Sequence, residues 1–343
     1  MEETEKGNNQ HLQDVLSRLE KRSKNHMQFG SQVDIERLET PSLSLTRAMS
    51  GGWAMGRMGL VWGPKAAGKS TFLLQQIAIA QQQGKVCAYL DSEKGFDKVW
   101  AASNKVNNDE LIYMRSGTVT DMVNNAVDLM DAGVDVIVVD SLSFMMPSTF
   151  IDENGDLKDF QKTGAIGGMA RSLSPALSQL TYANTNETLM LFVSQVRMAQ
   201  KGSMYWGAAP MGGKAVDHAM SQSIKLFASE GKDALITGEV TSGDRIYQKP
   251  IGRKVVWTVD KDRVGAGLGS TGEYTLYFDG DNIGVDRYAE LLGIAVEHGV
   301  IRKAGAWFSY NGENIGQGEL KTAARLREDE QLYSDVKDEL DAL

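Results

Sequence analysis

Short apolar runs alternate with longer stretches of helical length along most of this chain. The runs that we interpret as strands are residues 59–62, 86–91, 134–140, 188–195 and 255–260. Such alternation is typical of βαβ units, in which helices cover a largely parallel sheet. The pattern therefore predicts an α/β fold. Because ligands of such folds bind at the carboxyl ends of the strands, the candidate chemistry is expected there.

The two ends of the chain have patterns of their own. Residues 10–24 predict an amphipathic helix whose apolar face consists of Leu12, Val15, Leu16 and Leu19. Packing on its own domain and docking onto a neighbouring subunit both remain open for this helix. After residue 285, a helical stretch and the Trp-centred segment GAWFSYNG predict a small module. Residues 318–343 are rich in Asp and Glu and are expected to form a solvated helix or tail.

Three long polar stretches interrupt the alternation of apolar runs and helical stretches, at residues 148–171, 197–219 and 228–250. The first two follow expected strands, and their glycines and length predict functional or disordered loops. The third has no obvious chemistry and is expected to be a surface hairpin.

Composition narrows the class of protein. Of 343 residues, 42% are hydrophobic and 24% are charged, so the chain can bury a sizeable core as one main domain with smaller appendages. The single cysteine, Cys87, excludes a disulfide framework and a zinc site built from paired cysteines. The polar N-terminus has neither the basic start nor the apolar stretch of a signal peptide. No apolar run approaches the roughly 20 residues of a membrane helix. We therefore expect a cytoplasmic protein without a membrane partner. The net charge of -9 argues against a chain coated in nucleic acid but allows a local basic groove.

The most specific motif is GPKAAGKS, which fits G-x-x-x-x-G-K-[ST] and lies between an expected strand and an expected helix. Its glycines turn backbone N–H groups toward phosphates, Lys69 supplies an ammonium, and Ser70 offers a hydroxyl to Mg²⁺. The predicted phosphate-binding residues are Gly63, Pro64, Lys65, Ala66, Ala67, Gly68, Lys69 and Ser70.

Two carboxylates follow neighbouring strands of this pattern. Asp140 ends the run 134–140, where it can lie beside the magnesium ion and the phosphates. Glu93 follows the run 86–91. From the residues alone, Glu93 is equally a base for the attacking water and a surface carboxylate.

Further segments carry a family resemblance. TPSLSLTRAMSGGWAMGR leads into GPKAAGKST, and DSEKGFD, VDVIVVDS, SQVRM, the pair Gly212 and Gly213, and GVIRKAGAWFSYNGENIGQG follow. In this order the chain resembles the bacterial RecA recombinase family over nearly its whole length, and the C-terminal segment is more diagnostic than the phosphate motif. The resemblance implies a RecA-type P-loop ATPase core with a mostly parallel central sheet flanked by helices. It also implies an N-terminal oligomerisation helix and linker at 1–32, a core with two DNA-binding loops at 33–284, and a small C-terminal α+β domain with a short acidic tail at 285–343.

The resemblance also implies roles for single residues. Glu93 matches the catalytic glutamate, and Gln195 matches a glutamine that senses the γ-phosphate and signals to the adjoining DNA-binding loop. Lys261 and Arg263 match basic residues that reach the neighbouring subunit's ATP, so that hydrolysis requires assembly. With Lys69 these form the expected catalytic set. The other residues implied to bind ATP are Thr71, Asp97, Trp100, which would stack on adenine, Asp140 and Phe278, and the metal ligands are Ser70 and Asp140.

The stretches 148–171 and 197–219 match the DNA-binding loops of the family. The DNA-binding residues that this implies are Ile166, Gly167, Arg171, Arg197, Met198, Met204, Gly212 and Gly213. We expect these Gly-rich segments to order on binding DNA. The first stretch is longer and more acidic than is usual in the family, and His218 replaces an interface aromatic. Ile166 and Met204 are only candidates for the wedge that separates base triplets.

The expected function is ATP-dependent homologous recombination and repair after DNA damage. A homo-oligomeric filament on single-stranded DNA would pair with homologous duplex, exchange strands and hydrolyse ATP, with single-strand-binding proteins or repressors as possible partners. The alternatives are a RecA-core repair ATPase or helicase, and a filament scaffold that activates repressor self-cleavage.

Overall fold

The computed structural model describes residues 2–20, 30–152, 156–158, 168–201, 205–231, 234–242, 245–280 and 282–343. The chain divides into two compact units, Met1–Glu36 and Arg37–Leu343. The first unit contains α1 (Glu2–Glu20) and a short 3₁₀ helix, η1 (Gly30–Gln32). The predicted amphipathic helix is therefore present, although residues 21–24 lie outside the described residues. Leu12, Val15 and Leu19 on its apolar face are 45%, 37% and 44% exposed, so the described residues of this unit leave these side chains largely uncovered.

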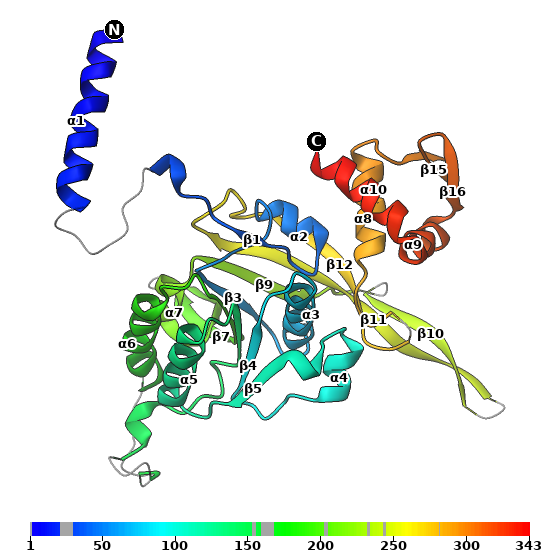
Figure 1. The fold of residues 1–343 in the computed structure, drawn as a ribbon. Helices are drawn as coiled ribbons and strands as arrows, with labels where there is room; N and C mark the ends of the chain where they lie inside the picture. The colour runs from blue at the N-terminus through cyan, green and yellow to red at the C-terminus, as the bar shows by residue number, and fades with distance from the viewer. Residues whose placement is uncertain are drawn as a thin grey trace. The chain divides into compact units, whose positions relative to one another are not determined.

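One large sheet forms the centre of the second unit (Figure 1). Its parallel part has the order β9–β3–β7–β6–β4–β5. These strands are β9 (Gln222–Ala228), β3 (Met58–Gly63), β7 (Leu189–Lys201), β6 (Val136–Asp140), β4 (Cys87–Asp91) and β5 (Leu111–Arg115). The predicted α/β fold with a mostly parallel sheet is confirmed.

Helices cover both faces of this sheet, which explains the continuous apolar runs. On β6, Val136 and Val138 join the buried cluster beneath α3, whereas Ile137 and Val139 join the cluster beneath α5 and α6. The helices of this part are α2 (Leu43–Ala48), α3 (Lys69–Gln82), α4 (Lys98–Ser103), α5 (Val119–Asp131), α6 (Gly168–Ala183) and α7 (Gly213–Ala219). The smaller elements are β1 (Arg37–Leu38), β2 (Trp53–Ala54), η2 (Asn108–Glu110) and η3 (Ser148–Phe150). No helix in the described part of the chain combines the length and apolar character that crossing a lipid bilayer requires.

Antiparallel strands extend the sheet beyond β9. They are β11 (Arg245–Asp262), β12 (Thr271–Tyr277) and β13 (Gly284–Val285), and β10 (Leu235–Ser242) pairs with the outer part of β11. The strand expected at 255–260 is thus present but antiparallel, because the chain returns to β9 through a hairpin rather than through a crossover helix. The β10–β11 pair confirms the surface hairpin predicted at 228–250.

The stretch 197–219 differs from the expected irregular loop. Residues 196–201 of β7 pair antiparallel with β8 (Tyr205–Pro210), and α7 follows. Tyr205 and Trp206 favour strand conformation, and pairing satisfies the backbone N–H and C=O groups of both segments. The described part of this stretch is therefore a β-hairpin and a short helix.

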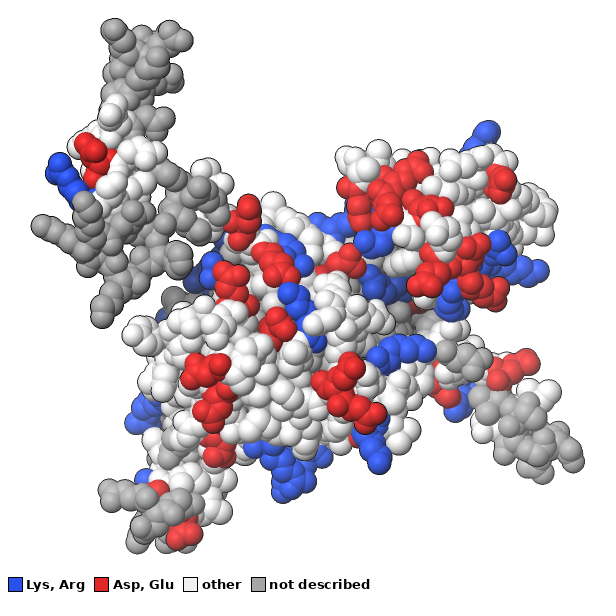
Figure 2. Space-filling view, in the orientation of Figure 1, with Lys and Arg blue, Asp and Glu red and all other residues white. Residues whose placement is uncertain are grey.

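The C-terminal residues form a small α+β layer with its own apolar core (Figure 1). Its elements are α8 (Arg287–Glu297), β14 (Arg302–Ala304), β15 (Trp307–Tyr310), β16 (Glu313–Gln317), α9 (Glu319–Glu328) and α10 (Glu330–Asp341). Acidic side chains gather over this region, as expected for a solvated helical face (Figure 2). The final residues are not a free tail, however, because they complete α10 and bury Val336 and Leu340 in this core.

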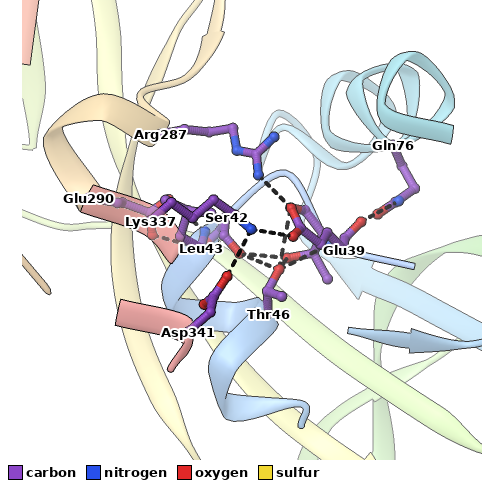
Figure 3. Close-up of polar contacts among 10 residues, drawn as sticks. Glu39, Ser42, Leu43, Thr46, Gln76, Arg287, Glu290, Lys337 and Asp341 are labelled. Atoms are coloured by element: carbon purple, nitrogen blue, oxygen red, sulfur yellow. Dashed lines mark hydrogen bonds and ion pairs between the residues drawn. The ribbon is translucent and has the colours of Figure 1, made fainter. Parts of the chain in front are cut away.

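A buried carboxylate joins the C-terminal layer to α2 (Figure 3). Glu290 of α8 accepts hydrogen bonds from Ser42 Oγ at 2.7 Å, Ser44 Oγ at 2.6 Å and the Leu43 backbone N–H at 3.1 Å. Burial raises the pKa of Glu290, although these donors partly oppose the shift. Glu290 therefore caps the start of α2 from a distant part of the chain.

A second contact joins the same layer to α3 (Figure 3). Glu39 forms ion pairs with Arg287 and Lys337, both at 2.9 Å. Burial favours the protonated form of Glu39, but Lys337 and Arg287 outweigh it and lower the pKa of this carboxyl. Gln76 of α3 donates from Nε2 to the Glu39 backbone oxygen at 2.7 Å. The C-terminal layer is thus tied to the helix that follows the phosphate motif.

Candidate functional site

The predicted phosphate-binding loop connects β3 to α3 at the carboxyl edge of the sheet. Its glycines are required by close packing from neighbouring strands. A Cβ on Gly63 would lie 2.0 Å from the Leu226 backbone oxygen of β9, and one on Gly68 would lie 2.4 Å from Leu276 Cδ2 of β12. Gly68 also has a φ of 85°, which favours glycine. The loop therefore packs against the Leu226 backbone at its first glycine and against the Leu276 side chain at its last.

Lys69 and the start of α3 provide positive charge at this loop. Lys69 is buried, and its Nζ donates to the backbone oxygens of Gly63 at 3.1 Å and Pro64 at 2.7 Å. Burial lowers the pKa of Lys69, and the nearby carboxylates of Asp140 and Glu93 oppose the shift. The first-turn N–H groups of α3 have no partner within the helix, so they are available to an anion. Ser70 and Thr71 lie in this first turn.

Asp140 lies at the end of β6 and faces the loop. It is buried, and Tyr89 donates its hydroxyl to Asp140 Oδ2 at 2.7 Å. Burial raises the pKa of Asp140, helped by Glu93 and Asp91 and opposed by hydrogen bonds from Ser70 and Tyr89. Ser70 and Asp140 thus present two hard oxygen donors side by side, which fits Mg²⁺. No group of three or more His, Cys, Asp and Glu side chains that could hold a metal occurs among the described residues.

Glu93 follows β4 with an exposed side chain, and neighbouring residues hold it by hydrogen bonds. Ser141 donates from Oγ to Glu93 Oε1 at 2.5 Å. The backbone N–H of Glu93 donates to Asp91 Oδ1 at 3.0 Å, and Phe96 N–H and the Tyr113 hydroxyl donate to Asp91 Oδ2 at 3.2 and 3.0 Å. The buried Asp91 therefore organises the turn that carries Glu93.

Sequence reasoning assigned no role to Asp91 or Ser141. A carboxylate at the end of a strand, two residues before a glutamate and four before a glycine, was the available signal for Asp91. Nothing local in the sequence indicates the Ser141 contact, because it joins residues 48 positions apart.

Gln195 connects the loop to the β7–β8 hairpin. In the parallel register of β3 and β7, Gln195 lies opposite Gly63. Its backbone N–H donates to Ser143 Oγ at 2.9 Å, and its backbone oxygen accepts from Met211 N–H at 3.1 Å, after the hairpin. The first residue of the phosphate loop and the base of the hairpin are therefore neighbours in the sheet.

Lys261 and Arg263 are not part of this cluster. Lys261 of β11 pairs with Ser223, which pairs in turn with Leu60 of β3, three residues before the loop begins. At a strand rise of about 3.3 Å per residue, this places Lys261 roughly 10 Å before that point along the strands. Lys261 Nζ donates to the Asp217 backbone oxygen, and burial lowers its pKa, with Arg263 adding to the shift. Arg263 N–H donates to the Ser221 oxygen at 2.9 Å.

The remaining nucleotide candidates lie in two places. Asp97 is the N-cap of α4 and accepts from the Trp100 N–H at 2.7 Å, and the half-buried Trp100 packs against the core. Phe278 follows β12 and is half-buried, with its N–H bonded to the Ile251 oxygen at 2.9 Å. The described contacts therefore give Asp97 a capping role in the fold.

The described DNA-binding candidates lie on three elements. Arg171 is in the first turn of α6, Arg197 and Met198 are in β7, and Gly212 and Gly213 begin α7. Arg197 Nη2 lies 3.5 Å from the position of a Cβ on Gly213, so β7 and α7 meet there. Ile166, Gly167 and Met204 lie outside the described residues.

Comparison with known proteins gives a consistent result over most of the chain. The family model of the RecA N-terminal domain matches residues 10–282, and that of the RecA C-terminal domain matches residues 289–342. A curated relative, Protein RecA of Colwellia psychrerythraea (strain 34H / ATCC BAA-681), is 34% identical over 312 residues. These residues are 90% of this chain and 84% of the relative.

Proposed function

Because the chain belongs to the RecA family, we propose that it is an ATP-dependent DNA recombinase. Its fold is of the RecA type, with a mostly parallel sheet, flanking helices and a small C-terminal domain. In the proposed function, ATP binding assembles a filament of this chain on single-stranded DNA. The filament pairs with homologous duplex and exchanges strands, and hydrolysis releases the DNA.

The observation that carries the proposal is the adjacency of the phosphate loop and the β7–β8 hairpin. Gly63 begins the loop and lies in register with Gln195, from which the hairpin extends. A conformational change at the γ-phosphate therefore passes from the loop directly to the neighbouring strand β7. This strand carries Arg197, which lies beside the backbone of Gly213. This arrangement supports Gln195 as the residue that couples nucleotide to DNA.

Hydrolysis follows from the residues around the loop. The first-turn N–H groups of α3 and the Lys69 ammonium bind the phosphates. Mg²⁺ held by Ser70 and Asp140 would neutralise charge on the β- and γ-phosphates. Glu93 accepts a proton from the attacking water, whose oxygen bonds to the γ-phosphorus as the bond to the β–γ bridging oxygen breaks and ADP leaves. Ser141 orients Glu93 for this transfer.

We propose that Lys261 and Arg263 complete the site of a neighbouring subunit. Their distance from the loop of their own chain supports this role, because Lys261 lies level with Leu60 of β3, three residues before the loop begins. Positive charge supplied in trans to a phosphoryl transition state contributes about 10³ to 10⁵ in rate. In this proposal, residues 1–32 serve oligomerisation, 33–284 form the ATPase core and 285–343 form the C-terminal domain.

The test is ATP hydrolysis with and without single-stranded DNA, across a salt series and a range of protein concentrations. We expect strong stimulation by DNA that falls as salt rises, because phosphate contacts release counterions. We also expect the rate per subunit to rise steeply with protein concentration.

Hydrolysis that is indifferent to DNA would contradict the recombinase proposal and would favour a RecA-core repair ATPase. Stimulation by DNA without strand exchange in a homologous duplex assay would favour the helicase or filament scaffold alternatives. The Lys69→Ala variant is the control for contaminating ATPases.

A further inference from the structure

Arg253 reaches the phosphate loop from β11, at a position to which the sequence analysis assigned no role. It lies on β11 and donates from Nη1 to the backbone oxygen of Ala66 at 2.9 Å. The side chain is half-buried, and it forms no ion pair with a carboxylate in the described part of the chain. A guanidinium with no carboxylate partner among the described residues therefore touches the loop that is proposed to bind the phosphates of ATP.

The register of the antiparallel strands explains why Arg253 points to the loop. Arg253 lies opposite Leu276 of β12, and directly opposed residues project on the same face of a sheet. Leu276 contacts the same loop at Gly68, where its Cδ2 leaves no room for a Cβ. The two cross-strand partners thus support the loop at two points, one apolar and one polar.

The contact falls on a loop residue with an unfavourable backbone conformation. Ala66 has a φ of 62°, in the left-handed region that side chains other than glycine avoid. The motif allows any residue at this position, so the sequence does not reveal the conformation. The hydrogen bond from Arg253 holds the Ala66 carbonyl in the orientation that this backbone conformation produces.

We propose that Arg253 is a positioning residue that fixes Ala66, and with it the phosphate loop, in the form that binds ATP. The inference rests on the proposed function, since it concerns the affinity of the same site for nucleotide. Arg253 acts on binding rather than on chemistry, because Glu93, Lys69 and Asp140 are held by other contacts.

The test compares the parent with R253Q, R253K and K254Q. Gln is too short to reach Ala66 and carries no charge, so R253Q should raise the KM and the Kd for ATP about tenfold, as loss of a charge-assisted hydrogen bond predicts. The kcat should stay within about twofold of the parent value, and R253K should be intermediate. Lys254 is the matched control, because it loses the same charge from the opposite face of β11, where it pairs with Glu273 at 3.1 Å.

A second pair of variants tests the route through Ala66. Glycine adopts the left-handed conformation freely, so R253Q should weaken ATP binding by only about threefold or less when it is made in an A66G background. A full tenfold loss in that background would overturn the positioning role and leave only a general effect of charge.

Equal effects of R253Q and K254Q, or parent-like binding by R253Q, would also overturn the inference. Failure of the parent protein itself to bind ATP would instead refute the proposed function, so the two failures are distinguishable.

Discussion

Replacing Glu93 with glutamine separates catalysis from structure at the proposed site. The carboxylate accepts a hydrogen bond from Ser141 Oγ at 2.5 Å, and an amide oxygen can accept the same bond. The backbone N–H of residue 93 remains bonded to Asp91. Because the side chain is exposed, we expect the free energy of unfolding to change by less than about 0.5 kcal/mol. The E93Q variant should therefore keep the parent fold and lose only the carboxylate that accepts the proton.

The size of the effect follows from the role of the lost group. A positioned general base contributes about 10² to 10⁴ in rate, which corresponds to about 3–5 kcal/mol of activation free energy. We expect E93Q to lose turnover by this factor. We also expect E93Q to bind ATP and single-stranded DNA with dissociation constants close to those of the parent, since Lys69 and the α3 N-terminus are unchanged.

The assay is single-turnover ATP hydrolysis on single-stranded DNA, with ATP binding measured on the same preparation. Glu110→Gln is the matched control, because Glu110 is an exposed carboxylate that precedes β5, and its turnover should equal that of the parent. Turnover by E93Q above about one tenth of the parent rate would refute the assignment of Glu93 as the base, given the smallest contribution expected of such a group.

Four further predictions concern other residues. Lys69→Ala should remove ATP hydrolysis, and a rate near that of the parent would show that the phosphate loop is wrongly assigned. Arg263→Ala should reduce DNA-stimulated hydrolysis at least about 100-fold if the residue acts in trans, while single-subunit ATP binding stays unchanged in an equilibrium binding assay. Glu290→Ala should lower the free energy of unfolding by about 2–4 kcal/mol in a denaturant titration, because it leaves buried donors of α2 unpaired. Glu290→Gln should gain stability relative to the parent as pH rises above 4.5, since a raised pKa in the folded state makes the parent lose stability as Glu290 ionises. A pH-independent difference between these two proteins would contradict the buried position of this carboxyl.

Much of the proposed site was predictable from the sequence because its parts are local. The phosphate motif needs only a strand, a glycine-rich turn and a helix in succession, and all three are contiguous around Gly63 and Lys69. Asp140 and Glu93 each follow an apolar run, and parallel strands bring their carboxyl ends to one edge. The hydrophobic pattern and the order of the motifs thus determined the α/β core, the edge where the site lies and the family resemblance.

The tertiary structure decided which distant groups meet at that edge. The apolar run at 255–260 does not reveal its direction, because β11 becomes antiparallel only through pairing with β9 and β12. That pairing places Arg253 on Ala66, and the fold likewise brings Ser141 to Glu93 and Glu290 to α2. These contacts join residues 48 to 248 positions apart. A hydrogen-bond donor encodes no preference for one distant acceptor over another, so its partner is set by the registers and packing of the assembled sheet rather than by local pattern.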